Sequence, residues 1–384
     1  MLDDVTIGAR LQTARKELGL TQGEVGKRIG MATSTISDIE AGKRSVTGAE
    51  LYQFARQLHR PLAFFFETEP EESPAFAYLF REAEPSVLDR DSIVLFRQLL
   101  EDYRLIEEIA EAAPLPLPPD YSQFGFRTEQ DAETLADMER GRLGLGDAPL
   151  KDLMNLLDGI IGVKTFLIPV ERQSWSGLVA RDRSGRPCIA VNAKEESYRR
   201  AFTLAHEYGH VLVHFRSGGA PAARIDRAIT LGQRSADESF ANAFASAFLM
   251  PRRAVLAQLE SVLGANSGKF TDADLVHLAM QLGVSGQALS ARLVTLRKLS
   301  RQVHEQYGNH RSFSDLAKAL GHPVEDWSLT PVLPARFRYL ALKAFEESRI
   351  SLAKLAELLR VNSYELRENL QSAGGAWAAA GAAG

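Results

Sequence analysis

Residues 202–214 read FTLAHEYGHVLVH, and this stretch contains the pattern His-Glu-x-x-His. On a helix, His206 and His210 are four residues apart and lie on one face. That spacing lets two imidazole nitrogens reach one Zn²⁺ at about 2.0–2.1 Å. Glu207 lies one residue further round, where its carboxylate can accept a proton from a metal-bound water without being a ligand. The apolar neighbours predict a buried helix that carries a metal site; the alternative is a core helix with two ordinary histidines.

A catalytic zinc site needs a third protein ligand and one open position. Residues 237–245 read DESFANAFA, which places Glu238 and Asn242 on one face of a second helix. We expect Glu238 to be the third ligand. We expect Asn242 to orient one of the ligands without contacting the metal itself. Asp237 is the rival ligand but faces about 100° away. The alternative for Glu238 is a first-turn acid that the helix dipole favours.

Two further residues of the first helix are candidates for a supporting role. His214 continues the stripe of His206 and His210, but it lies about 12 Å along the helix from His206, too far to share the ion easily. It either supports a ligand or the transition state, or is an ordinary core histidine. Tyr208 is a candidate oxyanion donor that can equally pack against a neighbour. The expected metal is Zn²⁺, with Mn²⁺ as the alternative.

The first 66 residues contain short amphipathic helices separated by glycines. Thr21 followed by Glu24 is a capping-box pattern at the start of one helix. In the next helix, Ile36 and Ile39 point inward and small polar residues cover the other face. This pattern predicts a helix-turn-helix that reads the major groove of DNA. The predicted contacts to bases or to the DNA backbone are Gln22, Ser34, Thr35, Ser37, Lys43 and Arg44.

The charge of this N-terminal region is small, with nine basic and seven acidic residues in 1–66. One module should therefore bind DNA modestly, and we expect a homodimer that reads two half-sites. The alternative is a helical bundle that only makes dimer or protein contacts.

Composition excludes several other classes of protein. The chain has 384 residues, a net charge of −4 and a single cysteine, Cys188, so an internal disulfide is excluded. No apolar run approaches the roughly 20 residues that a membrane span needs. The first residues lack the charged-then-apolar pattern of a signal peptide. We expect a cytoplasmic protein without a membrane partner.

Two resemblances to known families rest on these motifs. Residues 202–214, followed by Glu238-x-x-Ala241-Asn242-x-Phe244-Ala245 and residues 248–251, look like the ImmA/IrrE metallopeptidases. Residues 20–44 resemble the Xre/Cro-like helix-turn-helix repressors. The first resemblance implies a zincin-like fold and cleavage of a helix-turn-helix repressor that relieves repression in stress or mobile-element responses. It also implies His206, His210 and Glu238 as metal ligands and Glu207 as the catalytic acid/base.

We therefore expect a mostly helical α+β protein. Its segments are a helix-turn-helix domain (1–66), an acidic linker and helix (67–120), a zincin-like domain with a small sheet (121–262), a C-terminal helical domain (263–372) and a disordered Ala/Gly-rich tail (373–384). Segment 67–120 has fourteen acidic and four basic residues. The predicted strands are 160–168, 176–181 and 187–192. Residues 350–370 resemble a second helix-turn-helix, for which we favour packing, dimerisation or substrate docking over DNA reading.

Two functions remain open. The first is a zinc endopeptidase that binds operator DNA and cleaves an Xre-type repressor or an antitoxin-like protein. The second is a transcriptional regulator whose metallopeptidase-like domain senses a ligand or partner with little or no proteolysis. The retained Glu207 favours the first, because a sensor does not need a general base. A weaker third hypothesis is that the chain is an antitoxin-like regulator bound to a partner protein.

Overall fold

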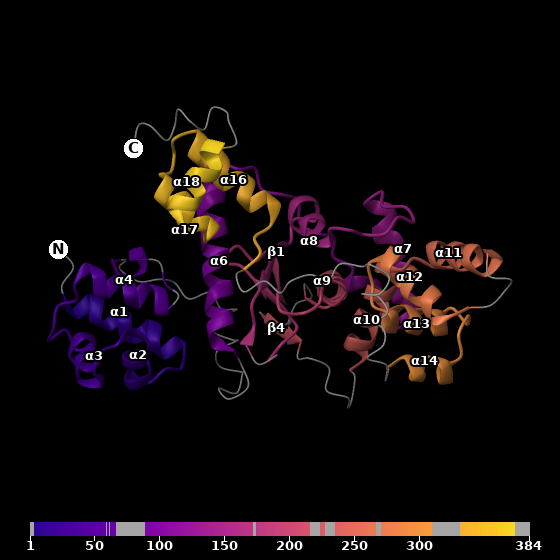
Figure 1. Cartoon of the computed structure of the whole chain (residues 1–384), viewed down its shortest axis with the longest axis horizontal. Helices are drawn as coiled ribbons and strands as arrows, with labels where there is room; N and C mark the ends of the chain where they lie inside the picture. Colours follow the sequence, from indigo (N-terminus) through magenta and orange to yellow (C-terminus); the bar gives the residue numbers. More distant parts are fainter. Residues whose placement is uncertain are drawn as a thin grey trace.

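The computed structural model describes residues 4–58, 60, 62–66, 89–171, 174–215, 223–226, 235–265, 270–308 and 331–372. These residues form the mostly helical α+β protein that the sequence predicts, with one small mixed sheet (Figure 1). The predicted tail (373–384) and the first part of the predicted linker (67–88) lie outside the described residues. In the described part of the chain, no helix has both the length and the hydropathy of a membrane span.

The N-terminal helices form the predicted helix-turn-helix bundle. Its elements are α1 (Asp4–Glu17), α2 (Gln22–Ile29), α3 (Thr33–Glu40), α4 (Gly48–Gln57) and the short η1 (Leu62–Phe66). The Thr21 hydroxyl accepts from the Glu24 N–H at 3.2 Å, and the Glu24 carboxylate accepts from the Thr21 N–H at 2.7 Å. This capping box fixes where α2 begins. Ile36 and Ile39 are buried in the bundle core, which leaves the opposite face of α3 outside.

The sheet has four strands in the order β1-β3-β2-β4. They are β1 (Lys164–Ile168), β2 (Gly177–Arg181), β3 (Pro187–Asn192) and β4 (Ala223–Asp226). β1 runs parallel to β3, whereas β2 is antiparallel to both β3 and β4. The predicted strands 176–181 and 187–192 are therefore present as β2 and β3, and they pair as a hairpin. β4 forms one edge of the sheet, which matters for the site described below.

One predicted strand is shorter than expected. Only 164–168 of the predicted 160–168 is β1, because Ile160 and Ile161 lie in the π-helical turn η3 (Leu157–Ile161) that follows α8 (Leu153–Leu156). A short apolar run fits a buried strand and a buried helical turn equally well, so periodicity cannot separate them. The side chain of Ile160 is in fact exposed.

Both faces of the sheet are covered, and the side chains of each strand alternate between them. Those that pack toward α9 (Ser197–Val213) include Leu167, Val179, Ile189 and Val191. Those that pack toward α6 (Arg90–Ile109) include Phe166, Leu178, Cys188 and Ala190. A sheet buried on both faces explains why its strands are nearly continuous apolar runs.

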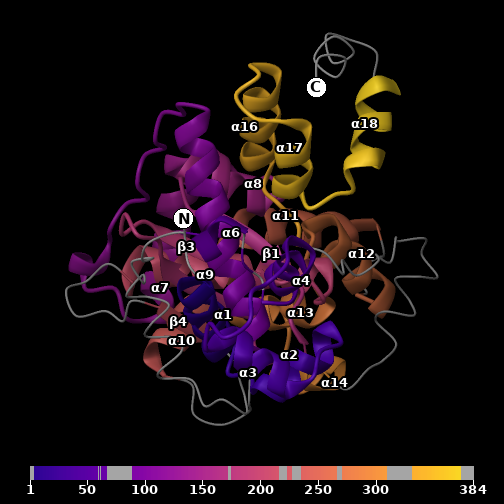
Figure 2. The ribbon, with the colours of Figure 1, turned by 90° about the vertical axis from the view of Figure 1, so that its left-hand side faces the viewer.

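Helix α6 is shared by three parts of the molecule (Figures 1 and 2). Near its start, Val94 is buried in the core of the helix-turn-helix bundle, and Asp91 pairs with Arg28 of α2 at 3.4 Å. In its middle, the rings of Phe96 and Phe166 meet with centroids 6.1 Å apart. Near its end, Asp102 pairs with Arg360 at 3.2 Å. The helix predicted within the acidic segment is therefore a central packing element.

The remaining helices lie on two sides of the sheet. On the α9 side are α7 (Glu129–Arg142), α10 (Ala236–Leu249), α11 (Arg252–Ala265), α12 (Asp272–Leu282) and α13 (Gly286–Thr295), with α14 (Arg301–Gly308) beside α13 and the short η2 (Ser122–Phe124) beside α9. On the α6 side are α16 (Ala335–Glu346), α17 (Leu352–Leu359) and α18 (Ser363–Ser372). Residues before and after position 262 belong to the same hydrophobic core. The helices of the segment 263–372 lie on both sides of the sheet. The predicted domain boundaries stay predictions.

Candidate metal centre

Helices α9 and α10 pack closely enough to bring the predicted site residues together. Gly209 of α9 faces Phe244 of α10, and a Cβ atom at 209 would lie 2.9 Å from the Phe244 ring. Ala241 is the other α10 residue at this contact, and it is fully buried. Small residues on both helices therefore permit the approach. The Ser235 hydroxyl caps α10 by accepting from the Glu238 N–H at 3.2 Å, which places Glu238 in the first turn.

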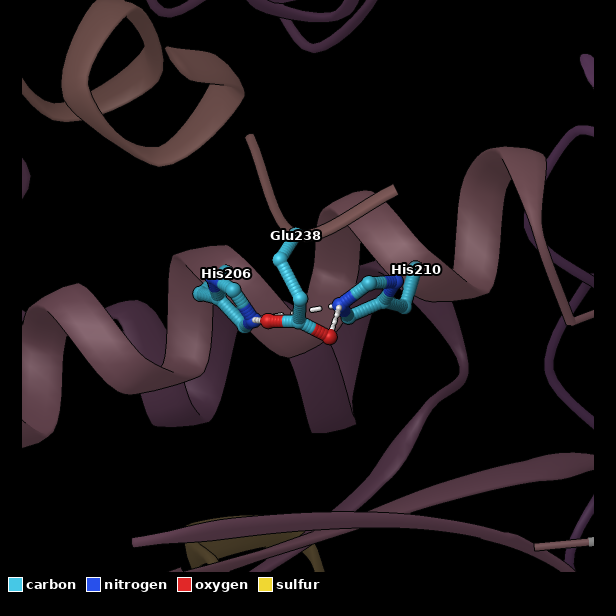
Figure 3. A group of neighbouring side chains, drawn as sticks. All are labelled: His206, His210 and Glu238. Atoms are coloured by element: carbon cyan, nitrogen blue, oxygen red, sulfur yellow. Dashed lines mark hydrogen bonds and ion pairs between the residues drawn. The ribbon is translucent and has the colours of Figure 1, made fainter. Parts of the chain in front are cut away.

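Three donor atoms meet between these two helices (Figure 3). The Nε2 atoms of His206 and His210 are 3.1 Å apart. One oxygen of the Glu238 carboxylate, Oε2, lies 3.2 Å from Nε2 of His206, and the other, Oε1, lies 3.5 Å from Nε2 of His210. Ligand atoms that share one tetrahedral Zn²⁺ at about 2.0–2.1 Å lie roughly 3.3–3.4 Å from one another. One ligand atom from each residue, two nitrogens and one carboxylate oxygen, lies within 4.8 Å of the others, and this triangle of donor atoms offers the ligand types that zinc accepts.

The electrostatics of the group also suit a cation. Burial lowers the pKa of His210 from 6.5 to about 3, which keeps its imidazole neutral. Burial raises the pKa of Glu238, but hydrogen bonds from His206, His210 and Arg224 outweigh it and hold this pKa well below its ordinary value. A neutral imidazole and an ionised carboxylate are the protonation states that coordinate metals.

Further polar side chains contact these three residues, two of them at the Nδ1 atoms of the histidines and one at Oε1 of Glu238. Asn242 Oδ1 lies 3.2 Å from His206 Nδ1. His214 Nδ1 lies 3.0 Å from His210 Nδ1. His214 is largely buried, and burial lowers its pKa. Arg224, on the edge strand β4, forms an ion pair with the Glu238 carboxylate. Each of the three donor residues thus has a further polar neighbour.

Glu207 lies on the side of α9 that faces the sheet, and its side chain is fully buried. Gly177, the first residue of β2, makes room for it. A Cβ atom at 177 would lie 2.9 Å from the Glu207 carboxyl carbon and 2.7 Å from Thr203 Cγ2. The carboxylate of Glu207 therefore lies between the motif helix and the first residue of β2.

Tyr208 points away from the donor atoms. Its hydroxyl donates to Glu139 of α7 and lies 3.3 Å from the Arg142 guanidinium. Glu139 also accepts from Tyr121 at 2.8 Å and from Arg142 at 2.7 and 2.8 Å. Burial, followed by the Glu139 charge, raises the pKa of Tyr208 well above its ordinary value. In this structure Tyr208 therefore packs against α7, and its role as an oxyanion donor stays a prediction.

The predicted DNA contacts lie mostly on the surface of the helix-turn-helix bundle. Ser34 and Ser37 of α3 are exposed, and Thr35 between them is half-buried. Lys43 and Arg44 follow α3 and are exposed, with Arg44 paired to Glu50 at 2.7 Å. The Gln22 amide donates to Glu40 at 2.9 Å. Gln22 thus has an internal partner, while the face of α3 is open.

Comparison with known families decides what the two parts are. The profile described as the IrrE N-terminal-like domain of peptidase family M78 matches residues 160–294. A profile described as helix-turn-helix matches residues 11–65. The chain carries an IrrE-like peptidase domain and a helix-turn-helix domain. The IrrE-like match includes the whole triangle of donor atoms, and it continues beyond α10 into α13.

Two curated relatives match a stretch of 67 residues of the chain. Two proteins described as uncharacterized HTH-type transcriptional regulators, from Sinorhizobium medicae and Rhizobium meliloti, are each 31% identical over 67 residues. The match covers 17% of this chain and 48% of each relative, so the chain spans about half the length of these regulators. The description of these relatives agrees with the helix-turn-helix domain at residues 11–65.

Sequence reasoning missed Arg224 and Gly177 at the site of the IrrE-like domain. Neither belongs to the His-Glu-x-x-His motif, and each comes from a strand whose pairing brings it near the motif helix. For Gly177, a glycine at the start of a predicted strand was the one available signal, since glycine in strands marks close approach of another group.

Proposed function

We propose that the chain is a metal-dependent endopeptidase that also binds DNA. The observation that carries this proposal is the triangle of His206, His210 and Glu238: the two Nε2 atoms, on the helix that also carries the buried Glu207, lie 3.1 Å apart, and each lies within 3.5 Å of a Glu238 carboxylate oxygen. Those three residues would hold the cation, with Zn²⁺ as the preferred metal and Mn²⁺ as the alternative. The bound ion would supply Lewis acidity toward water and toward a peptide carbonyl.

The role that we propose for Glu207 is proton transfer. Its carboxylate would accept the proton of the attacking water and pass it to the leaving amine. The surrounding burial excludes bulk water, which strengthens the interaction of this carboxylate with nearby charge. Asn242 and His214 would orient the two histidines through their Nδ1 atoms.

The substrate that we propose is a helix-turn-helix repressor or an antitoxin-like protein, and its cleavage would derepress stress or mobile-element genes. The IrrE-like domain supports a peptidase, and the attached helix-turn-helix domain supports action at operator DNA. We propose that the protein works as a homodimer, because one weakly charged module needs a second half-site for tight binding.

A second candidate function is favoured by helix α6. This helix packs into the core of the helix-turn-helix bundle at Val94 and against the sheet of the IrrE-like domain at Phe96. Such a shared element suits a regulator in which binding at the metal centre changes DNA binding, with little or no proteolysis. Both candidates use the same metal centre and differ in whether Glu207 acts.

The test compares wild type with Glu207→Gln. Each purified protein is incubated with the Xre-type repressor encoded beside it, with and without Zn²⁺, and fragments are identified by mass spectrometry. We expect wild type to cleave the repressor only with metal, and Glu207→Gln to retain the metal but lose cleavage. Equal cleavage by both proteins would rule out Glu207 as the base. Normal DNA binding with no fragment from wild type would favour the regulator.

A further inference from the structure

Arg224 and Asp237 take part in a closed ring of polar contacts beside the metal centre. His210 Nδ1 lies 3.0 Å from His214 Nδ1, and His214 Nε2 lies 3.5 Å from the Asp237 carboxylate. Asp237 lies 3.7 Å from the guanidinium of Arg224, which in turn pairs with Glu238. Glu238 closes the ring at 3.5 Å from His210 Nε2.

The ring has a single consistent assignment of protons when His210 binds a cation. A coordinating Nε2 requires the proton of the neutral imidazole to sit on Nδ1. His210 then donates to Nδ1 of His214, so the proton of His214 sits on Nε2. That N–H faces the carboxylate of Asp237. A carboxylate at the end of such a chain fixes the tautomer and the ring orientation of the coordinating histidine.

The other half of the ring fixes the carboxylate of Glu238. Arg224 reaches it from β4, and the same guanidinium also faces Asp237. A guanidinium is a planar, permanently charged donor that holds a carboxylate in a defined orientation. The two carboxylates and one guanidinium leave the ring with a net negative charge, which favours a divalent cation at its edge.

We propose that Arg224 and Asp237 are positioning residues that hold His210 and Glu238 in the geometry needed for metal binding. This inference rests on the proposed function, because it concerns the same metal centre. It departs from the expectation that Asp237 is a rival ligand: Asp237 acts through His214 and Arg224. Arg224 also links the metal centre to the edge strand of the sheet.

The test measures metal binding directly and needs no substrate. Zn²⁺ affinity of the full-length protein is determined by competition with a chromogenic chelator for wild type, Arg224→Ala, Arg224→Lys and Asp237→Asn. We expect Arg224→Ala and Asp237→Asn to weaken Zn²⁺ binding by about 10–100-fold, the usual effect of removing a residue that orients a ligand. Arg224→Lys keeps the charge and one donor, so it should recover part of the loss.

Two controls separate positioning from general effects. Asp272 is also an acid in the first turn of a helix, and Asp272→Asn should bind Zn²⁺ like wild type. His206→Ala should lose the ion. The visible absorption of the Co²⁺-loaded proteins adds a second measure, because displaced ligands change the spectrum whereas a distant loss of stability does not. The side chain of Asp237 is 53% exposed, so Asp237→Asn creates no buried cavity.

The outcomes distinguish this inference from the proposed function. If Arg224→Ala binds Zn²⁺ as tightly as wild type, or more tightly, repulsion by the guanidinium outweighs its positioning of Glu238 and the inference is wrong. If the ring variants behave like wild type while His206→Ala loses the ion, the inference is wrong and the metal centre stands. If wild type takes up no Zn²⁺, the metal centre and the inference are both wrong.

Discussion

Gly177 of β2 lies directly against the carboxyl group of Glu207, so that a side chain at 177 would occupy the space of that carboxylate. A Cβ atom there would lie 2.9 Å from the carboxyl carbon of Glu207. Glu207 is fully buried and cannot move into solvent without opening the contact between α9 and the sheet. The position of the proposed general base therefore depends on a glycine that precedes it by thirty residues.

Gly177→Ala should displace Glu207 while leaving the donor atoms of His206, His210 and Glu238 in place. We expect repressor cleavage to fall by at least about tenfold, because a misplaced general base loses part of a 10²–10⁴-fold contribution. Zn²⁺ content should remain that of wild type. Gly141→Ala is the control, since a Cβ atom at 141 meets nothing within 4 Å. Undiminished cleavage by Gly177→Ala would show that this contact does not set the position of Glu207.

Local spacing explains which parts of the centre could be predicted. His206 and His210 are one helical turn apart, as are Glu238 and Asn242, so each pair shares a face whatever the rest of the fold does. The role of Arg224 could not be predicted in this way. It reaches Glu238 only because β4 pairs with β2, and strand pairing between distant segments leaves no periodic signal in one sequence.

The position of α6 in the fold likewise could not be predicted from sequence patterns. The apolar stripe of Leu95, Leu99, Ile106 and Ile109 predicts a helix, and the acidic residues before it predict a linker. The structure buries Val94 with the helix-turn-helix core and Tyr103 with the sheet. An amphipathic pattern shows that a helix has a partner and does not show which one. The π-helical turn at Ile160 could not be predicted either, because a short apolar run is compatible with both a buried strand and a buried helical turn.

Removal of His206 should weaken metal binding more than removal of the Asn242 amide that contacts it. His206→Ala deletes one of three donor atoms and should abolish stoichiometric Zn²⁺ binding, as measured by atomic emission after dialysis. Asn242→Ala removes only the oxygen 3.2 Å from His206 Nδ1 and should weaken binding by about tenfold. Unchanged Zn²⁺ content in His206→Ala would contradict the assignment of this residue as a ligand.

Stability should depend on pH through a buried carboxyl group far from the metal centre. Burial raises the pKa of Asp158 from 3.8 to about 6, against the lowering by hydrogen bonds from Tyr103 and Thr165. The folded state therefore holds a proton that the unfolded state releases. Its contribution is present below about pH 4, and stability falls as the pH rises toward 6 and beyond.

Asp158→Asn removes this titration and keeps an acceptor for Tyr103. The free energy of unfolding of the variant relative to wild type should increase by roughly 2–3 kcal/mol between pH 4 and 7.5. Urea unfolding in the presence of a chelator measures the difference without a contribution from bound metal. Asp102, whose pKa burial also raises to about 6, remains in both proteins, so its contribution cancels. A difference that stays constant over this range would rule out titration of Asp158.

The exposed face of α3 should carry the affinity for operator DNA. Replacing Ser34, Thr35 and Ser37 together by alanine removes three hydroxyls and leaves the buried Ile36 untouched. Contacts to base edges contribute about 1–3 kcal/mol each when they are well formed, so loss of even one lowers affinity by about tenfold. Anisotropy measurements at one salt concentration, with an operator selected in vitro by the full-length protein, test this.

The matched control is Thr13→Ala. It removes an exposed hydroxyl on α1 that bonds to Ala9, and the variant should bind DNA like wild type. Equal affinity of the triple variant and the control would show that α3 does not read the bases, and the bundle would then be a protein-contact module.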